Sequence, residues 1–346
     1  MKRDAAYNKK VNEQLEQYAS VETLHTLPAI RDYWFEKFII PRVRQVFYHE
    51  KPARGNFYVN FFEDILRKSE TGQAMLLSLG AGDCKHEVAI VKELKARGLS
   101  GFRLECLELS NNLLQMGAEM AQEAGVSDLM VFSQADLNDW NPRRNYDGVM
   151  AHHALHHFVE LEKIFSGIMQ CIGTKGIFIT CDVIGRNGHL LWPETLGIVE
   201  SLWSTLGSEK KSHCRSKKYC EKFPNHDCST KGFEGVRAQD ILPLLIDHFS
   251  FEYFLGYGGL TDPFVGRVFG CNYKTDSAED RAFIDAVQLV NDALCDVGYL
   301  KPTRMIAILR NRGWQGQPRY FRTWSPEFCR RLVPKNIAGP AKSVST

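Results

Sequence analysis

LLSLGAGDCKHEVAIV, residues 76–91, decides the fold of this chain. A short, mostly apolar run enters Gly80 and Gly82, and an apolar pattern at helical spacing resumes at Val88. The apolar run is typical of a strand that is buried on both faces of a parallel sheet. Glycine lets the backbone turn and approach a ligand closely, and the free N–H groups at the start of the next helix favour an anion. The stretch predicts a strand, turn and helix that bind a nucleotide-like ligand.

The alternation of apolar strand and amphipathic helix repeats downstream of this stretch. We expect buried strands at 74–80, 102–110, 129–137, 146–155 and 176–184. This alternation indicates a doubly wound parallel sheet. After Ile184 the rhythm breaks, and two more strands are expected at 251–260 and 303–310.

These patterns divide the chain into three parts. Residues 1–70 are helical and irregular, and we expect them to form a cap in front of the sheet. Residues 71–310 form the α/β domain, in which the polar segment 185–235 is an insertion and the helix 278–298 separates the last two strands. Residues 311–346 form a basic C-terminal tail.

Composition narrows the class of protein. The 346 residues are 44% hydrophobic and 24% charged, with a net charge of +2, which favours neither nucleic acid nor an anionic membrane as a partner. The polar N-terminus is unlike a signal peptide, and no apolar run is long enough to span a membrane. Several of the ten cysteines lie inside apolar runs, namely Cys106, Cys171 and Cys181. We therefore expect reduced cysteines in a cytoplasmic protein and regard disulfides as the weaker interpretation.

Acidic and basic side chains end the predicted strands. Parallel sheets bind ligands beyond the carboxyl ends of their strands. Glu108 ends the second strand, where it can accept both hydroxyls of a ribose, and Asp136 ends the third, where it can reach an adenine amino group. His152 and His153 end the fourth strand. Only two glycines of the dinucleotide-binding fingerprint are present, and no G-K-[ST] of a P-loop follows them.

This set of strand ends resembles a class I S-adenosylmethionine-dependent methyltransferase. In that family the first strand ends in acid-x-G-x-G-x-G, and here Ser78 takes the acidic position and Cys84 the third glycine. Glu108, QADL at 134–137 and MAHHALHHFVELEKIF at 150–165 match the later motifs. Three longer stretches are similar to a bacterial subgroup without a defined substrate: GRNGHLLWPETL, DCSTKGFEGVRAQDILPLL and DPFVGRVFG.

The resemblance implies a fold and a cofactor. The fold is a Rossmann-like sheet of seven strands, mostly parallel, whose last strand is antiparallel. The cofactor is S-adenosylmethionine, and the product is S-adenosylhomocysteine. The residues that it assigns to the cofactor are Gly80, Ala81, Gly82, Asp83, Glu108, Leu109, Asp136, Leu137 and His152.

Histidines after the fourth strand are the predicted catalytic residues. A neutral imidazole can take a proton from a hydroxyl, phenol or amine. Strand alternation sends His152 and His153 to opposite faces, so we favour His153 as the base, followed by His152 and His156. The alternative is that proximity and desolvation suffice and no base is needed.

Substrate contacts are expected from the cap and from the segment after the fifth strand. Asp182, His189 and Glu194 are predicted to line the acceptor pocket, with loop capping as the alternative. Tyr33 and Trp34 are predicted to reach the same pocket from the cap, with burial in its core as the alternative.

The insertion and the tail carry further polar clusters. The insertion holds His213, Cys214, Cys220, His226 and Cys228, but it lacks the C-x₂₋₄-C spacing of a zinc site, so we expect no metal and interpret 185–235 as a substrate lid. The basic tail is expected to be solvated. The alternative is that its arginines hold an anionic substrate or packed carboxylates, the residues being Arg319, Arg322, Arg330 and Arg331.

Taken with the resemblance, these features predict methyl transfer to an oxygen or nitrogen atom of a small-molecule acceptor, in secondary metabolism such as natural product biosynthesis. A nucleic-acid or protein methyltransferase is a first alternative. The [DNS]-P-P-[YF] of amino-methylating nucleic-acid enzymes is replaced here by AHHAL at 151–155, and the net charge is near neutral. A non-catalytic protein that binds S-adenosylmethionine or a related nucleotide is a second alternative. We leave a homodimer open.

Overall fold

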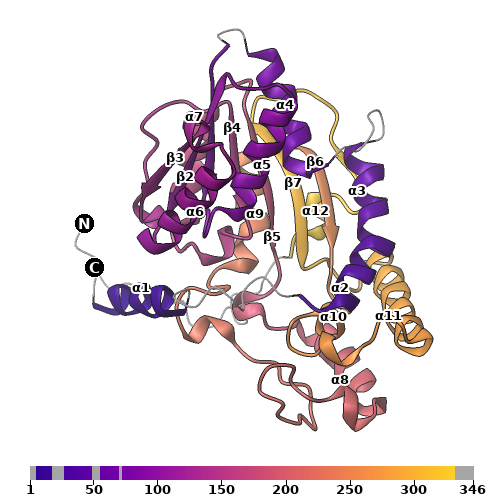
Figure 1. The fold of residues 1–346 in the computed structure, drawn as a ribbon. Coiled ribbons are helices and arrows are strands. Elements are labelled where there is room, and N and C mark those ends of the chain that lie inside the picture. The colour runs from indigo at the N-terminus through magenta and orange to yellow at the C-terminus, as the bar shows by residue number, and fades with distance from the viewer. Residues whose placement is uncertain (1–4, 18–26, 49–54, 70–71, 332–346) are drawn as a thin grey trace.

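An eight-stranded sheet forms the centre of the protein (Figure 1). The computed structural model describes residues 5–17, 27–48, 55–69 and 72–331. The strand order is β3-β2-β1-β4-β5-β7-β6-β8. The strands are β1 (Ala74–Leu79), β2 (Phe102–Glu108), β3 (Met130–Gln134), β4 (Gly148–His152), β5 (Ile177–Val183), β6 (Phe249–Tyr257), β7 (Arg304–Asn311) and β8 (Arg319–Tyr320).

Strand direction confirms the predicted fold class. The first five strands pair in parallel, and β7 lies between β5 and β6, antiparallel to both. The expected helix between the last two strands is α11 (Ala278–Asp296). The sequence did not predict β8, which pairs with β6 in parallel over only two residues, too few for a period-2 pattern.

The helices that join the strands cover both faces of the sheet. After β1 the chain moves outward through α5 (Lys85–Ala96) and α6 (Asn111–Glu123) to β2 and β3. After β3 it returns to β4 and continues in the opposite direction through α7 (Leu161–Ile172), which packs against α9 (Ala238–His248). Right-handed crossovers in opposite directions place the two sets of helices on opposite faces. The reversal at β1 and β4 is the switch point where ligands bind.

Polar caps set the ends of several helices. Ser110 accepts a hydrogen bond from Leu113 N at the start of α6, and Ser277 accepts one from Asp280 N at the start of α11. The same arrangement occurs in the tail, where Ser325 Oγ accepts from Phe328 N at the start of α12 (Pro326–Cys329). Each cap satisfies a backbone donor that the helix leaves unpaired.

The N-terminal residues that the structure describes are helical. They form α1 (Ala5–Gln17), α2 (Ala29–Trp34), a π-helical turn (Phe35–Ile39), α3 (Ile40–Phe47) and α4 (Phe57–Lys68). The π-helical turn lies just before Pro41, which has no N–H for the helix ladder. In Figure 1, α1 lies apart from α2, α3 and α4.

The segment after β5 is mostly irregular, as expected for an insertion. Its helices are η6 (Asn187–His189), α8 (Pro193–Thr205), η7 (Ser208–Lys210) and η8 (Cys228–Thr230). Two short helices follow β6, namely α10 (Asp262–Val265) and η9 (Gly270–Asn272). Among the described residues, we find no helix with the length and apolar character needed to cross a bilayer.

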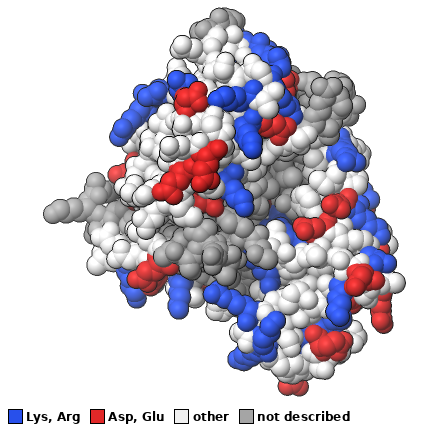
Figure 2. All heavy atoms as spheres, in the orientation of Figure 1, with Lys and Arg blue, Asp and Glu red and all other residues white. Residues whose placement is uncertain are grey.

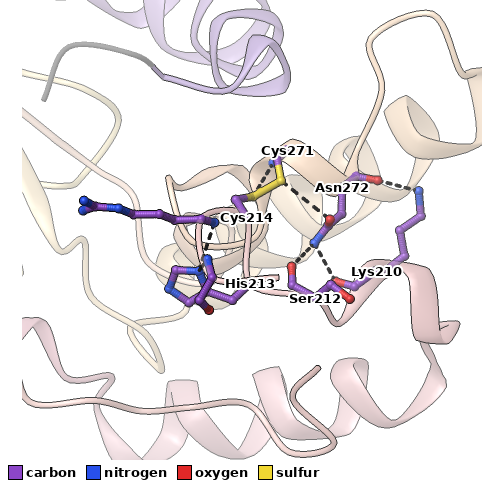
Figure 3. The surroundings of a disulfide bond; sticks show 8 residues. Lys210, Ser212, His213, Cys214, Cys271 and Asn272 are labelled. Carbon is purple, nitrogen blue, oxygen red and sulfur yellow. Dashed lines mark hydrogen bonds between the residues drawn. A yellow bond between two sulfur atoms is a disulfide. The ribbon is translucent and has the colours of Figure 1, made fainter. Parts of the chain in front are cut away.

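One pair of cysteines corrects the expectation of a fully reduced protein. Cys214 of the insertion forms a disulfide with Cys271 of η9 (Figure 3). Their separation of 57 residues hides this proximity in the sequence. Hydrogen bonds hold the two segments together, since Cys214 N donates to Val268 O at 2.7 Å and the side-chain Asn272 Nδ2 donates to Ser212 O at 2.7 Å. The bond also removes Cys214 from the set of thiolates that could hold a metal.

The disulfide gives a first prediction. Replacing Cys214 and Cys271 together with serine should lower the free energy of unfolding by about 2–4 kcal/mol, because the bond closes a long loop in the unfolded chain. Urea unfolding of this variant and of the wild type, with and without reductant, measures the difference. Two results together would contradict the prediction. All four samples would have the same stability, and peptide mapping of the wild type without reductant would find free thiols at Cys214 and Cys271.

Candidate functional site

The glycine turn after β1 combines close packing with open space. Gly80 and Gly82 have φ values of +70° and +57°, in the left-handed region that favours glycine. A Cβ on Gly80 would lie 2.8 Å from Ala154 Cβ, so this glycine lets the turn pack against the loop after β4. A Cβ on Gly82 would meet no atom within 4 Å. The turn therefore leaves room for a ligand at Gly82.

Cys84 occupies the third glycine position of the motif without changing its backbone. Its φ is +57°, and it immediately precedes α5. A Cβ on Gly117 of α6 would lie 2.7 Å from Cys84 Cβ. The glycine on α6 thus provides the space that the cysteine side chain needs.

Acidic side chains from two neighbouring strand ends lie at the turn. Glu108 accepts hydrogen bonds from Gly82 N and Ser110 N, both at 3.0 Å, and so ties the end of β2 to the turn. Asp136 follows β3 and accepts from Asn138 N at 3.0 Å. The structure thus places Gly82, Glu108 and Asp136 along one edge of the sheet.

The remaining residues that we assigned to the cofactor are part of the same edge. Asp83 Oδ1 accepts from Lys85 N at 3.2 Å at the start of α5. Ala81 and Leu109 are half-buried beside the turn and the end of β2, and Leu137 is buried after β3.

A buried acid compensates for Ser78, which replaces the acidic residue of the motif. Ser78 Oγ donates to Glu87 Oε1 at 2.7 Å, and both side chains are buried. Burial raises the pKa of Glu87 to about 7, against the opposing effect of the hydrogen bond from Ser78. The sequence analysis missed Glu87, although an acid in the first turn of the helix after the glycine turn was a usable signal.

The pKa of Glu87 makes stability depend on pH. Because the folded protein holds this proton more tightly than the unfolded chain, its stability falls as the pH rises from about 4.5 to about 7. Glu87→Gln removes this effect. The stability of the variant relative to wild type should therefore rise by roughly 3 kcal/mol between pH 4.5 and 8. Urea unfolding at the two pH values tests this, with Glu119→Gln at an exposed position of α6 as the control. A pH-independent difference would show that Glu87 is ionised in the folded state.

His152 and His153 lie together at the end of β4, which corrects the expected placement on opposite faces. Their ring centroids are 4.7 Å apart. The alternation ends with the strand at His152, and His153 has a φ of +51°. His153 Nε2 lies 3.9 Å from Cys181 Sγ on β5.

Two residues that the sequence analysis missed complete this group. Tyr58 of α4 lies with its hydroxyl 2.9 Å from His152 Nδ1, and His86 of α5 stacks on His152 at 4.5 Å. Burial lowers the pKa of His86 to about 3 and that of His152 to about 4, and it lowers the pKa of His153 well below its usual value. All three imidazoles are therefore neutral at pH 7, and the same burial makes them weaker bases than an exposed histidine.

Asp182 organises the loop that carries these histidines. Its fully buried carboxylate accepts from Ala154 N at 2.9 Å, Leu155 N at 2.8 Å and Val183 N at 2.7 Å, and it lies 2.5 Å from His156 Nδ1. Burial alone would raise the pKa of Asp182, but His156 lowers it to about 2. Asp182 therefore anchors the loop, and the structure favours the alternative of loop capping for this residue.

A second histidine cluster forms around Glu234, which the sequence analysis also missed. Glu234 Oε1 lies 2.6 Å from His189 Nε2 and 3.5 Å from His156 Nε2. Burial would lower the pKa of His156, but Asp182 and Glu234 raise it to about 10. Burial would raise the pKa of Glu234, but the histidines hold it below its usual range.

The cap residues Tyr33 and Trp34 have other partners than those predicted. Trp34 is fully buried, and its Nε1 donates to Gln288 Oε1 at 2.6 Å. Tyr33 donates from its hydroxyl to Asp285 Oδ1 at 2.9 Å. Both partners lie on α11, so the structure favours the alternative that these residues belong to the packing of the cap.

Arginines of the tail pair with carboxylates. Arg331 forms an ion pair with Glu194, the third residue predicted to line the acceptor pocket. Arg322 and Arg330 pair with Asp296 and Glu327 at 2.6 and 2.9 Å. The structure thus favours packed carboxylates for these three arginines, while residues 332–346 of the tail lie outside the described part of the chain.

Helix α1 contacts both the strand ends and the insertion. The Tyr7 hydroxyl donates to the two carboxylate oxygens of Asp136 at 2.9 and 2.8 Å. Gln14 Oε1 accepts from Phe233 N at 3.0 Å, and Glu13 Oε2 accepts from Gly232 N at 3.0 Å. These contacts bring α1, the end of β3 and the last part of the insertion together.

Comparison with known proteins identifies the segment that contains the turn. Residues 78–180 match the family model for a methyltransferase domain. No curated protein matches the chain. One similar solved structure is a methyltransferase from Geobacter sulfurreducens in complex with S-adenosylhomocysteine. It is 11% identical, with 79% of this chain and 98% of that chain covered and a TM-score of 0.39. Another is a putative sarcosine dimethylglycine methyltransferase from Galdieria sulphuraria, 14% identical, with 74% and 85% covered and a TM-score of 0.42.

Proposed function

We propose that this chain, whose residues 78–180 match the model of a methyltransferase domain, is a class I S-adenosylmethionine-dependent methyltransferase that methylates an oxygen or nitrogen atom of a small-molecule acceptor. The product of the cofactor is S-adenosylhomocysteine. We further propose that the acceptor is a metabolite of secondary metabolism.

The residues at the strand ends fit the cofactor. The open space at Gly82 admits a ligand directly above the turn. The Glu108 carboxylate is suited to ribose hydroxyls, and Asp136 and Leu137 are suited to the polar and apolar edges of adenine. We propose that these residues, with Gly80, Ala81, Asp83, Leu109 and His152, hold S-adenosylmethionine. When bound, the cofactor supplies an electrophilic methyl group on a sulfonium.

The contact of α1 with the insertion is the main observation that supports a small-molecule acceptor. Tyr7 binds Asp136, while Gln14 binds Phe233 from the insertion. A site covered from both sides excludes water and suits a small molecule better than a polymer. Figure 2 shows Lys, Arg, Asp and Glu interspersed over the face in view, which also speaks against a broad phosphate-binding face there.

His153 is the residue that we propose as the general base. Its imidazole is neutral and lies at the carboxyl end of β4, beside the proposed cofactor site. His152 is the second choice, because its Nδ1 is already paired with the Tyr58 hydroxyl. His156 is no longer proposed, since both of its ring nitrogens face carboxylates, those of Asp182 and Glu234.

A methyl-transfer assay that detects S-adenosylhomocysteine tests the proposal. The acceptors are a panel of phenols, alcohols and amines, with oligonucleotides and peptides as the competing classes. We expect turnover with a small molecule, and His153→Gln should lower kcat by about 10²–10⁴-fold without weakening cofactor binding. His248→Gln on α9 is the matched control. Turnover with polymers only, or cofactor binding with no turnover in any class, would overturn the proposal.

A further inference from the structure

The cluster around Glu234 has the composition of a metal site. His156, His189 and Glu234 each offer one ligand atom, and these atoms all lie within 4.8 Å of one another. We propose that these three residues bind a divalent first-row transition metal ion, for which Zn²⁺ is the best match. Two imidazoles and one carboxylate form a known zinc donor set that leaves a coordination position open.

The distances between the donor atoms agree with a shared metal. Metal–ligand bonds of about 2.0–2.1 Å in a tetrahedral site place neighbouring ligand atoms roughly 3.3 Å apart. His156 Nε2 and Glu234 Oε1 are 3.5 Å apart. His189 Nε2 and Glu234 Oε1 are 2.6 Å apart, which is a hydrogen-bond distance, so a small rotation of the His189 ring would admit the ion.

Asp182 holds the His156 ring from the side opposite the proposed metal. It lies 2.5 Å from His156 Nδ1, which directs His156 Nε2 toward Glu234. A carboxylate on the far nitrogen of a histidine ligand fixes the ring and makes it a better donor. His157 lies beside the site, with its Nε2 3.6 Å from Glu234 Oε2, where it can hydrogen-bond a metal-bound water.

Backbone contacts hold the three ligands in place. Val236 N donates to His156 O at 3.1 Å, and Gly188 N donates to Gly235 O at 2.9 Å. These bonds join η6, the loop before α9 and the loop after β4. His189 has a φ of +56°, and the structure maintains this unfavourable backbone at a residue that presents a ligand atom. The site rests on these residues alone and does not depend on the identity of the methyl acceptor.

Metal analysis of the tag-free, full-length protein tests the proposal directly. The protein is stripped with a chelator and titrated with Zn²⁺, with Mn²⁺ and anaerobic Fe²⁺ as alternative ions, by calorimetry and thermal denaturation. We expect one equivalent of metal per chain and a higher Tm in its presence. The absorption spectrum of bound Co²⁺ should show nitrogen and oxygen ligands without a sulfur charge-transfer band, and this measurement needs no variant.

Variants locate the metal. His189→Ala and Glu234→Gln should each weaken binding by about 100-fold or more, and Asp182→Asn by about 10–100-fold. His248→Ala, in which a partly buried histidine of α9 is removed, should have no effect. A Cys220→Ser, Cys228→Ser double variant should retain the metal. These two free cysteines are the competing ligands, since they are partly exposed and the other free cysteines of the described residues are buried.

Three results would overturn the proposal. The first is no metal binding by the wild type after reconstitution, which would make the cluster a network of ion pairs. The second is unchanged affinity in His189→Ala. The third is a sulfur charge-transfer band, or loss of metal in the double cysteine variant, because the ion would then be bound by thiolates elsewhere.

Discussion

Replacing Gly82 with leucine is expected to raise the Kd of S-adenosylhomocysteine by about 100-fold or more, while the protein remains folded. A Cβ at this position meets no atom within 4 Å, so we expect the leucine side chain to project into the space that we assign to the ligand. Gly80 is a poorer choice for this test, because a Cβ there would lie 2.8 Å from Ala154 Cβ and would disturb the loop as well as the ligand. Calorimetry with S-adenosylmethionine and S-adenosylhomocysteine measures the effect.

Gly98 provides the matched control for this substitution. It has a φ of +81°, and a Cβ there also meets no atom within 4 Å. It lies just after α5, at the end of the helix far from the glycine turn. Leucine at either position carries a left-handed backbone cost of about 1–2 kcal/mol, so the two variants should lose similar stability. Only Gly82→Leu should lose the ligand. Equal binding by both variants would remove the cofactor from the glycine turn.

The sheet was predictable because its signals are local. Each strand from β1 to β5 is a short apolar run followed by a turn, and each of these strands lies within or close to the predicted range. Gly82, Glu108 and Asp136 were found for the same reason, since parallel strands bring their carboxyl ends to one edge.

Contacts between distant segments were not predictable in this way. Tyr7 binds Asp136 across 129 positions, and His189 binds Glu234 across 45. Neither the periodicity of the sequence nor the spacing of its motifs indicates that two such distant residues are in contact. The disulfide was missed for the same reason. The predicted orientation of His153 was wrong for a different reason. Strand alternation was assumed to continue to His153, one residue beyond the end of β4.

Asp182 also makes contacts between distant segments, and its loss should cost much stability. Asp182→Ala should lower the free energy of unfolding by about 3–5 kcal/mol. Its carboxylate satisfies the backbone donors of Ala154 and Leu155 and pairs with His156, all in the interior. Alanine would leave the N–H groups of Ala154, Leu155 and Val183 and the imidazole of His156 without this acceptor, which is costlier than the loss of the hydrogen bonds themselves.

Asparagine at position 182 separates the contribution of the charge to stability from that of the hydrogen bonds. Asp182→Asn keeps an oxygen for the two backbone donors but loses the charge that faces His156, so it should cost clearly less than Asp182→Ala. Urea unfolding at pH 7 measures both variants. A loss below about 1 kcal/mol for Asp182→Ala would mean that water or another side chain replaces the carboxylate, and the loop after β4 would then not depend on this residue.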